Sequence, residues 1–168
     1  MTMQLRPLEA KDAPLMLEWM HDESVVKDLQ TNFATKTLDD CLAFIRSSVN
    51  STTDKHFAIT DHNDEYMGTV SLKHIRQERR DAEFAITVRA CAMGKGFSAF
   101  GMQRIIELGL QQYGLHTVYW CVSPDNQRAV RFYDKNNYPR VDVKNLQPIG
   151  YTQEQLDYYT WYAVTAHM

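Results

Sequence analysis

Two glycines, Gly94 and Gly96, flank a lysine directly before a stretch that predicts a helix, in the segment "CAMGKGFSAF". Glycine lacks a Cβ, so its backbone reaches left-handed conformations and lets a ligand approach closely. The first turn of a helix leaves N–H groups without partners and carries the positive end of the helix dipole. The segment therefore predicts a backbone site for a phosphate or pyrophosphate, although a plain glycine-rich turn has the same composition.

Two nucleotide-binding motifs can be compared with this segment. A P-loop needs Ser or Thr after its lysine, whereas here Gly96 follows Lys95. Gly94, Gly96 and Ala99 do match the dinucleotide fingerprint G-x-G-x-x-A, but that motif places its first glycine at the very end of a strand. Here "RACAM" separates Gly94 from Val88. A dinucleotide-dependent oxidoreductase is therefore the weaker alternative.

Length, charge and cysteine content exclude several classes of protein. The chain has 168 residues, and we expect residues 1–168 to form a single domain. The net charge of −3 and the interruption of the basic run "KHIRQERR" by Glu78 argue against a nucleic-acid or anionic-membrane partner. No apolar run has membrane-spanning length, and the start lacks the apolar centre of a signal peptide. The three cysteines without a CxxC pair favour reduced thiols and a cytoplasmic location, and the scattered histidines predict no metal site.

Hydrophobic periodicity and turn residues predict the helices and strands that would position the glycine loop. Helix starts are expected at Asp12 and at Thr37, which has Asp40 three residues later, and Gly114 is a left-handed stop. A turn-rich cluster at residues 61–64 predicts a hairpin. The expected strands are residues 3–9, 55–60, 65–75, 82–88, 117–122 and 158–165, and the expected helices are residues 12–20, 37–49, 97–113 and 126–136. This order predicts an α+β domain with a mixed sheet.

Two sequence blocks follow each other in the second half of the chain. The first, "EFAITVRACAMGKGFSAFGMQRIIELGLQQYGLHTVYW", has the layout strand, short loop, Gly-x-Gly and helix. The second contains Asn126, Ala129, Phe132 and Tyr133 in the pattern Asn-x-x-Ala-x-x-Phe-Tyr. Together they resemble the GNAT family of N-acetyltransferases, and the opening "LRPLEAKDAPLMLEWM" is similar to its ribosomal-protein and amino-sugar branches. Cys91 stands where the family often has Gln or Arg, and because this loop binds pyrophosphate mostly through its backbone, we expect binding to persist.

The resemblance implies a fold and a co-substrate. The expected fold is a single α+β domain with a mixed, mostly antiparallel twisted sheet flanked by helices, with acyl-CoA held at a splay between central strands. In the family, a bulge at about residues 86–88 splays the strand whose backbone binds the pantetheine arm, and acetyl-CoA is the co-substrate. The cofactor-binding residues implied by the resemblance are Ile86, Thr87, Val88, Met93, Gly94, Lys95, Gly96, Phe97, Ser98, Ala99, Asn126 and Tyr133.

The resemblance also implies catalytic roles. The Val88 N–H would polarise the thioester carbonyl, and Tyr133 would give a proton to the departing thiolate, since a phenol with a pKa of about 10 is protonated at neutral pH. The alternative for Tyr133 is an ordinary core-edge tyrosine. Glu83 is the candidate base or amine-binding carboxylate, and its alternative is a solvated strand end. Ribosomal-protein relatives carry a glutamate where Cys121 stands, and we expect the Cys121 thiol to be inert because its strand is apolar.

The predicted function is acetyl-CoA-dependent N-acetyl transfer to a primary amine, directly and within a ternary complex. An amino sugar, a protein N-terminal amine, a polyamine and an aminoglycoside all stay open as acceptors. The stretch "ERRDAEFAI" is similar to spermidine acetyltransferases, and Asp22, Glu23 and Glu83 are carboxylates for a cationic acceptor. A non-catalytic acyl-CoA-binding or regulatory module is the alternative, against which Asn126 and Tyr133 argue. We expect a monomer or a homodimer, with no nucleic-acid or membrane partner.

Overall fold

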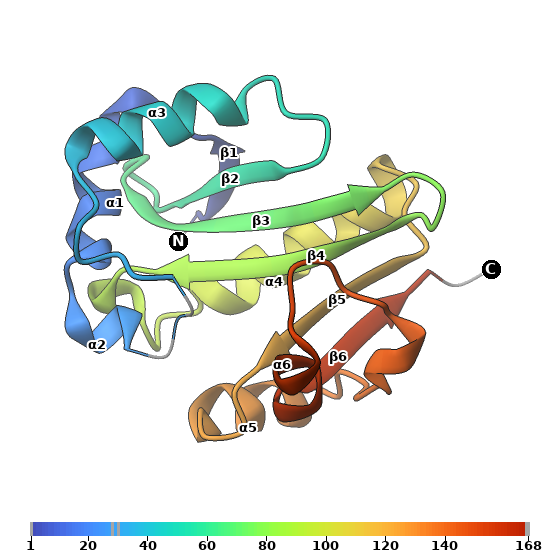
Figure 1. Cartoon of the computed structure of the whole chain (residues 1–168). Coiled ribbons are helices and arrows are strands. Elements are labelled where there is room, and N and C mark those ends of the chain that lie inside the picture. The colour runs from blue at the N-terminus through green and yellow to red at the C-terminus, as the bar shows by residue number, and fades with distance from the viewer. Residues whose placement is uncertain (1, 28, 30, 167–168) are drawn as a thin grey trace.

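The helices of the protein pack around one six-stranded sheet (Figure 1). The computed structural model describes residues 2–27, 29 and 31–166. The strands are β1 (Gln4–Pro7), β2 (Lys55–Thr60), β3 (Tyr66–Arg76), β4 (Asp81–Val88), β5 (Thr117–Val122) and β6 (Thr160–Thr165). They lie side by side in chain order, and each neighbouring pair is antiparallel except β4–β5, which is parallel. The predicted mixed, mostly antiparallel sheet of an α+β fold is confirmed.

Helices cover both faces of this sheet. The parallel pair β4–β5 needs a crossover connection, which α4 (Phe97–Glu107) and the π-helical turn η3 (Leu108–Gln112) provide. In Figure 1, α4 lies behind β3 and β4, whereas α1 and α3 pack together at the other side. Besides α4, the described helices are α1 (Ala13–Met20), α2 (Glu23–Val26), α3 (Leu38–Ser48), α5 (Gln127–Lys135) and α6 (Gln153–Tyr158), with the 3₁₀ turns η1 (Ala10–Asp12), η2 (Ala90–Ala92) and η4 (Val143–Asn145).

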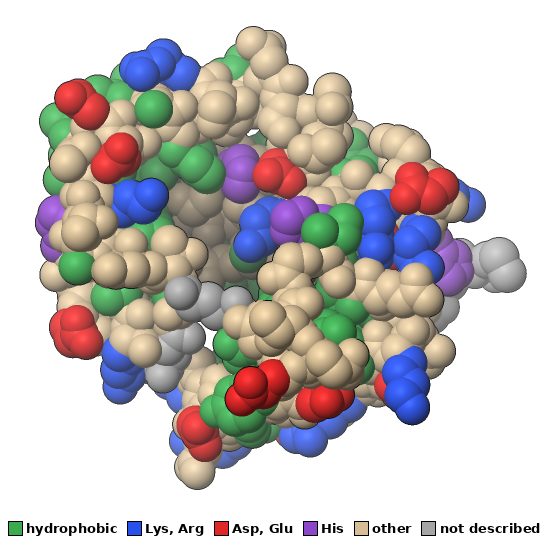
Figure 2. Space-filling view, viewed as in Figure 1, with side chains coloured by type: hydrophobic (Ala, Val, Ile, Leu, Met, Phe, Trp, Pro, Cys, Tyr) green, Lys and Arg blue, Asp and Glu red, His purple; other side chains and the backbone are tan. Residues whose placement is uncertain are grey.

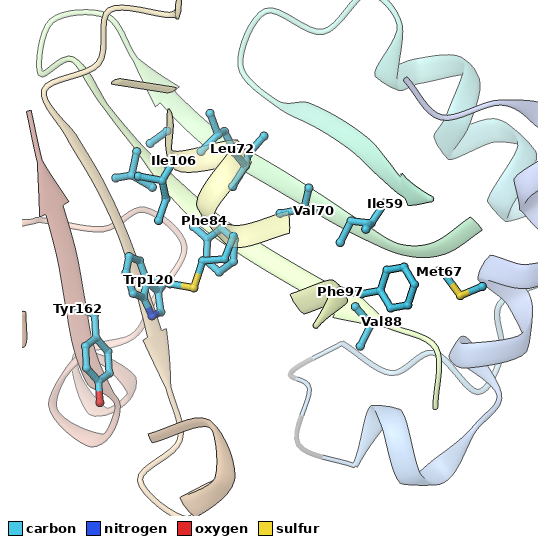
Figure 3. Packing of buried hydrophobic residues seen from close by; sticks show 14 of the residues in the cluster. Ile59, Met67, Val70, Leu72, Phe84, Val88, Phe97, Ile106, Trp120 and Tyr162 are labelled. Atoms are coloured by element: carbon cyan, nitrogen blue, oxygen red, sulfur yellow. The ribbon is translucent and has the colours of Figure 1, made fainter. Parts of the chain in front are cut away.

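Alternation along β4 directs its side chains to two different faces of the sheet. Phe84 and Val88 join the large apolar core under α4, together with Leu72 and Ile106 (Figure 3). Glu83 directly precedes Phe84, so its side chain points to the opposite face of the sheet. There the C-terminal part of the chain covers it. The sheet therefore separates an α4 face from the face that carries Glu83.

The central strands β4 and β5 are paired over a short distance only. Their parallel pairing covers residues 81–83 of β4 against residues 117–119 of β5. Beyond Glu83 the two strands separate, while β3 stays paired with β4 as far as Val88. The predicted splay between central strands is thus present, at the point where β4 leaves β5.

β4 has no bulge at residues 86–88, where one was expected. The β3–β4 register is continuous from Leu72–Phe84 to Gly68–Val88 and shifts only between Lys73 and Arg76. The prediction of a bulge in β4 was therefore wrong. The opening instead comes from the separation of two neighbouring strands, which needs no extra residue in either of them.

Two predicted helix starts differ in outcome. The Thr37–Asp40 capping box is confirmed, because the Asp40 N–H donates to Thr37 Oγ1 at 3.2 Å and the Thr37 N–H donates to Asp40 Oδ2 at 2.9 Å. Asp12 does precede α1, but its side chain makes no cap there. Its buried carboxylate accepts two hydrogen bonds from Arg6, both at 2.8 Å, and one from the Glu9 N–H at 2.8 Å. The predicted Asp12 cap was wrong because a buried carboxylate binds where a guanidinium neutralises it.

Two short helices were missing from the predicted elements. Asp22 caps α2, and a capping box formed by Thr152 and Gln155 starts α6. Because α6 extends to Tyr158, the last strand begins at Thr160, two residues later than predicted. None of the helices in the described ranges is both long and apolar enough to cross a membrane.

Candidate active site

The separation of β4 from β5 leaves one edge of β4 open. The Arg89 N–H, just after β4, donates to the Met67 carbonyl of β3 at 2.9 Å. In an antiparallel ladder, successive N–H groups point to opposite edges of the strand. The N–H groups of Ile86 and Val88 therefore point away from β3 into the opening, whereas the Thr87 N–H points to β3. Within the described residues no strand pairs with this edge beyond residue 83, so Ile86 and Val88 present free donors there.

Gly68 of β3 allows a close approach between β3 and the end of β4. A Cβ at Gly68 would lie 2.6 Å from the Thr87 carbonyl oxygen and 2.9 Å from Val88 Cα, which is closer than real Cβ atoms come. Only glycine permits this position of the Thr87–Val88 peptide group, which carries the Val88 N–H. Gly68 was absent from the predicted site, although a glycine inside a strand signals close backbone approach.

The glycine loop leads directly into the first turn of α4. Gly94 and Gly96 have φ values of +76° and +89°, in the left-handed region that favours glycine. The Met93 and Lys95 N–H groups already donate to carbonyls inside the loop, at 3.2 and 3.3 Å. Among the predicted loop residues, the N–H groups without a protein partner in the described ranges are those of Gly94, Gly96, Phe97, Ser98 and Ala99. The candidate anion site therefore has five available donors at the start of α4, fewer than the seven predicted loop residues.

A guanidinium group stands beside this loop. Arg128 Nη2 lies 3.8 Å from the position that a Cβ on Gly94 would occupy. Arg128 is in the first turn of α5, so the folded chain brings the two predicted blocks together at the loop. A positive charge next to free N–H groups strengthens an anion site. Arg128 was not among the predicted residues, because only its exposed position beside Gly94 distinguishes it from other surface arginines.

Asn126 serves as the N-cap of α5. Its Oδ1 accepts the Ala129 N–H at 3.2 Å. This bond explains an Asn at the start of the helix, since an N-cap side chain reaches the backbone N–H group three residues later. The amide nitrogen of Asn126 is free of this cap and is the group available to a bound cofactor.

Tyr133 lies in an aromatic cluster on the α4 face of the sheet. Its ring centroid is 5.4 Å from that of Trp120 and 5.1 Å from that of Tyr162, and both of these belong to the core under α4. Burial raises the pKa of Tyr133 above its ordinary value. The phenol therefore keeps its proton at neutral pH, as a donor to a leaving thiolate requires.

Glu83 is buried on the opposite face. Glu83 is only 4% exposed, so the alternative of a solvated strand end was wrong. Glu83 Oε2 accepts a hydrogen bond from the Tyr151 hydroxyl at 2.5 Å. Glu83 Oε1 is buried without a partner among the described residues. A buried carboxylate oxygen without a donor is costly, which marks this oxygen as one that a proton, a water or a ligand N–H would satisfy.

Cys121 is close to Glu83 and is unreactive as a nucleophile. Burial raises the pKa of the Cys121 thiol to about 12, and its sulfur lies 3.5 Å from the Tyr151 hydroxyl. A thiol with this pKa holds very little thiolate at neutral pH. The prediction that the Cys121 pKa is raised by its apolar strand is confirmed.

The face that carries Glu83 is hollowed at its centre. Figure 2 shows the hollow between the side with α1 and α2 and the side with the C-terminal part of the chain, with histidine, acidic and basic side chains along its rim. By strand register, Lys73 is the direct cross-strand neighbour of Glu83, and Ser71 is that of Ala85. Ser71 Oγ is hydrogen-bonded to His56 Nδ1 at 2.6 Å, and burial lowers the His56 pKa. This face of the sheet thus carries one buried carboxylate, a lysine and a histidine whose pKa burial lowers.

The three candidate catalytic residues lie on different sides of this opening. Val88 lines its edge, Tyr133 lies on the α4 face and Glu83 lies on the hollowed face. Across residues 2–27, 29 and 31–166, no three His, Cys, Asp or Glu side chains gather as a metal site requires. The arrangement suits two substrates that approach the opening from opposite faces of the sheet.

Comparison with known proteins gives relatives of one kind. Residues 2–138 match the family model described as an acetyltransferase (GNAT) domain. The uncharacterized N-acetyltransferase p20 of Bacillus licheniformis is 24% identical over 139 residues, which cover 81% of this chain and 78% of that protein. The spermidine N(1)-acetyltransferase of Vibrio cholerae serotype O1 is 24% identical over 134 residues, 78% of this chain and 75% of that protein. A crystal structure of spermidine N-acetyltransferase from Vibrio cholerae in complex with CoA and spermine has a TM-score of 0.79 at 18% identity, covering 97% of this chain and 95% of that one.

The match to the family model includes every site residue that the sequence predicted, from Glu83 to Tyr133. It begins before β1, contains the opening between β4 and β5 and the glycine loop, and ends at Tyr138, after α5. The free N–H groups at the start of α4 and the open edge of β4 are the features that an acyl-CoA needs from the backbone. The chain belongs to the GNAT family of acetyl-CoA-dependent N-acetyltransferases.

Proposed function

We propose that this enzyme transfers the acetyl group directly to a primary amine while both substrates are bound, and that the amine belongs to a polyamine. The observation that carries this proposal is the opening between β4 and β5, with Tyr133 on one face and Glu83 on the other. Holding the two reactants together in the correct orientation removes much of the entropic barrier to their reaction. A covalent acetyl-enzyme through Cys121 is disfavoured because its thiol has a pKa of about 12.

Each proposed residue acts at one atom. The Val88 N–H donates to the thioester carbonyl oxygen as negative charge develops there. Glu83 accepts one proton from the ammonium group, directly or through water, so that the neutral amine forms the C–N bond. As the C–S bond breaks, the Tyr133 hydroxyl donates a hydrogen bond to the leaving sulfur. The thiolate takes up the second amine proton, directly or through solvent, and Glu83 releases its proton to solvent.

The glycine loop is proposed to bind the pyrophosphate of acetyl-CoA. Support comes from the five free N–H groups at the start of α4 and from the Arg128 guanidinium beside Gly94. On this proposal, Ile86 and Val88 contact the pantetheine arm through the open edge of β4. Asn126 and Tyr133 contact it from α5. The Met93 and Lys95 N–H groups are left out of this proposal, because each already donates to a carbonyl within the loop.

The polyamine is proposed on the basis of the relatives. Spermidine N(1)-acetyltransferases of Vibrio cholerae and Escherichia coli K12 are among the proteins that this chain resembles, each at 24% identity. Of the three carboxylates predicted to face a cation, Glu83 lies at the opening, whereas Asp22 Oδ1 accepts hydrogen bonds from Ser24. Glu23 is exposed in α2. Glu83 is therefore the proposed contact of the reacting amine.

One observation favours a second acceptor class, the amino sugars. Lys73 is the cross-strand neighbour of Glu83, and its positive charge opposes a second ammonium group placed beside the reacting one. An amino sugar carries a single amine on a body of hydroxyl groups. The His56–Ser71 pair on the same face offers hydrogen-bonding groups to such a body.

A panel of amines tests the proposal. Thiol release from acetyl-CoA would be measured with spermidine, spermine, an amino sugar, an aminoglycoside and a peptide with a free N-terminus. We expect spermidine to give the highest kcat/KM and initial-rate plots to intersect. A higher kcat/KM for the amino sugar would overturn the polyamine assignment alone, whereas parallel initial-rate lines would overturn direct transfer. Thermal shifts with acetyl-CoA and NAD separate the CoA site from a dinucleotide site.

The assembly and location of the enzyme stay predictions. A related spermidine N-acetyltransferase from Vibrio cholerae has been described as a dodecamer. The expectation for this chain is a monomer or a homodimer, which light scattering of the purified protein would test. A cytoplasmic location and a single domain over residues 1–168 are also kept as predictions.

Replacing Arg128 with alanine is expected to weaken acetyl-CoA binding about fivefold, the upper end of what an exposed ion pair contributes. The defect should shrink in high salt, because Arg128 is exposed and salt screens exposed charges. Isothermal calorimetry at two ionic strengths measures both effects.

Lys135→Ala is the matched control for Arg128→Ala. Lys135 is an exposed base in the last turn of α5, so its loss changes the net charge equally at the other end of the same helix. We expect its affinity for acetyl-CoA to equal that of the wild type. Equal losses in both variants would show a general charge effect and remove Arg128 from the site.

A further inference from the structure

A hydroxyl group from the C-terminal part of the chain holds the buried carboxylate at the opening. The Tyr151 hydroxyl donates to Glu83 Oε2 at 2.5 Å across 68 positions of sequence. The Tyr151 ring packs edge-on against Trp161 of β6, with centroids 5.1 Å apart. Burial, with the nearby Cys121 and Glu83, raises the pKa of Tyr151, so its hydroxyl stays a donor. Tyr151 therefore approaches Glu83 from a segment that belongs to neither β4 nor β5.

The surroundings of Glu83 leave one of its oxygens without a donor. Lys73 neighbours it on β3, Tyr119 on β5, and Cys121 lies farther along β5. Asp81 shares its face of β4 but is paired with Arg76 and Arg79. Among the described residues Glu83 Oε1 and the Tyr119 hydroxyl are both buried without partners. Two unsatisfied polar groups on paired strands mark a place for a water or a ligand N–H.

The segment that carries Tyr151 is anchored to the turn between β3 and β4. Arg76 donates to the carbonyls of Leu146 and Gln147 at 2.8 and 2.7 Å. Arg79 donates to the carbonyl of Asn145 at 2.9 Å. The same two guanidinium groups bind the buried Asp81 carboxylate. This network fixes the segment on the sheet a few residues before Tyr151.

We infer that Tyr151 is a positioning residue, which holds Glu83 through Oε2 and leaves Oε1 as the oxygen that accepts the proton of the acceptor amine. The inference rests on the proposed role of Glu83 as the base and adds the group that controls it. A hydrogen bond donated to a carboxylate favours its ionised form. Tyr151 thus holds the carboxylate in one orientation through Oε2, with Oε1 left for the incoming proton.

The test compares three single variants and one double variant with the wild type in kcat–pH profiles at saturating substrates. Tyr151→Phe keeps the ring and removes only the donor. Tyr159→Phe makes the same change in a neighbouring ring of the same aromatic cluster, 6.2 Å from Tyr151. Glu83→Gln is the reference variant, which removes the acidic limb if Glu83 is the base. Circular dichroism and calorimetric acetyl-CoA affinity confirm that each variant is folded and binds its co-substrate.

Tyr151→Phe is expected to move the acidic limb up by about one pH unit, because the carboxylate loses a donor to its charged form. At pH values below the limb, kcat of Tyr151→Phe should be about tenfold lower than that of the wild type. Near pH 9 the two profiles should approach each other. Tyr159→Phe should keep the wild-type limb, and adding Tyr151→Phe to Glu83→Gln should cause no further change.

The role of Glu83 as the base and the role of Tyr151 as its positioning residue can fail separately. A wild-type acidic limb in Glu83→Gln would overturn Glu83 as the base and, with it, the role of Tyr151. A lost limb in Glu83→Gln together with an unmoved limb in Tyr151→Phe would overturn Tyr151 alone. Equal shifts in Tyr151→Phe and Tyr159→Phe would show that packing of the aromatic cluster, and not the hydrogen bond, sets the limb.

Discussion

Replacing Tyr133 with phenylalanine is expected to lower kcat about 100-fold, the scale of losing a positioned proton donor. The ring would keep its packing on Trp120 and Tyr162, at 5.4 and 5.1 Å between centroids. Acetyl-CoA affinity should therefore stay close to that of the wild type. Single-turnover kinetics would measure the chemical step, and calorimetry would measure the affinity.

The raised pKa of Tyr133 decides how this hydroxyl can act. Burial holds it in the protonated form, and a thiol has an ordinary pKa of only about 8.5. Full transfer of the phenolic proton to the thiolate is therefore uphill, so the main contribution is a hydrogen bond that strengthens as charge develops on sulfur. It follows that Tyr133 should add no basic limb to the kcat–pH profile below about pH 10.

Tyr138→Phe is the matched control for this variant. Tyr138 also packs on Trp120, with centroids 5.3 Å apart, and belongs to the same aromatic cluster. Its loss of a hydroxyl should leave kcat within about twofold of the wild type, as expected where no transition-state contact is removed. A normal chemical step in Tyr133→Phe, or equal losses in the two variants, would refute the role of the Tyr133 hydroxyl.

Replacing Gly96 with valine is expected to weaken acetyl-CoA binding at least about tenfold, or about 1.4 kcal/mol. Gly96 has a φ of +89°, a conformation that a β-branched residue adopts only under strain. The added side chain would also stand at the start of α4, where the free N–H groups converge. Met3 Cε lies 3.6 Å from the Cβ position, so there is little room on that side.

Backbone strain alone must be separated from loss of the anion site. Gly114→Val introduces a similar strain, since Gly114 has a φ of +67° and no atom lies within 4 Å of its Cβ position among the described residues. Both variants should lose thermal stability, and only Gly96→Val should lose affinity. A folded Gly96→Val protein with wild-type calorimetric affinity would remove the pyrophosphate assignment from the loop.

Much of the fold could be predicted from the sequence because its signals are local. The Thr37–Asp40 capping box joins groups three residues apart, and the glycine loop precedes its own helix. The hairpin of β2 and β3 follows from a turn between two adjacent strands. Such features depend on the conformational preferences of neighbouring residues, which are the same before and after the chain folds.

The conformation of the glycine loop was predictable for the same reason, whereas the positive charge beside it was not. Gly94 and Gly96 take the positive φ values that their residue type suggests. Arg128 lies beside Gly94 only because the folded chain brings the first turn of α5 close to the glycine loop. Among several exposed arginines, the sequence contains no signal that selects this one.

The chemistry at the opening was decided by tertiary structure. Whether Glu83 is solvated or buried depends on the C-terminal segment, which covers it with Tyr151 from 68 positions away. The separation of β4 from β5 after residue 83 likewise depends on where two distant strands cease to pair, since no bulge marks it. Strand alternation could assign Glu83 to a face, because side-chain direction is a local property. The partner it meets on that face is set by the path of the whole chain, which no local pattern encodes.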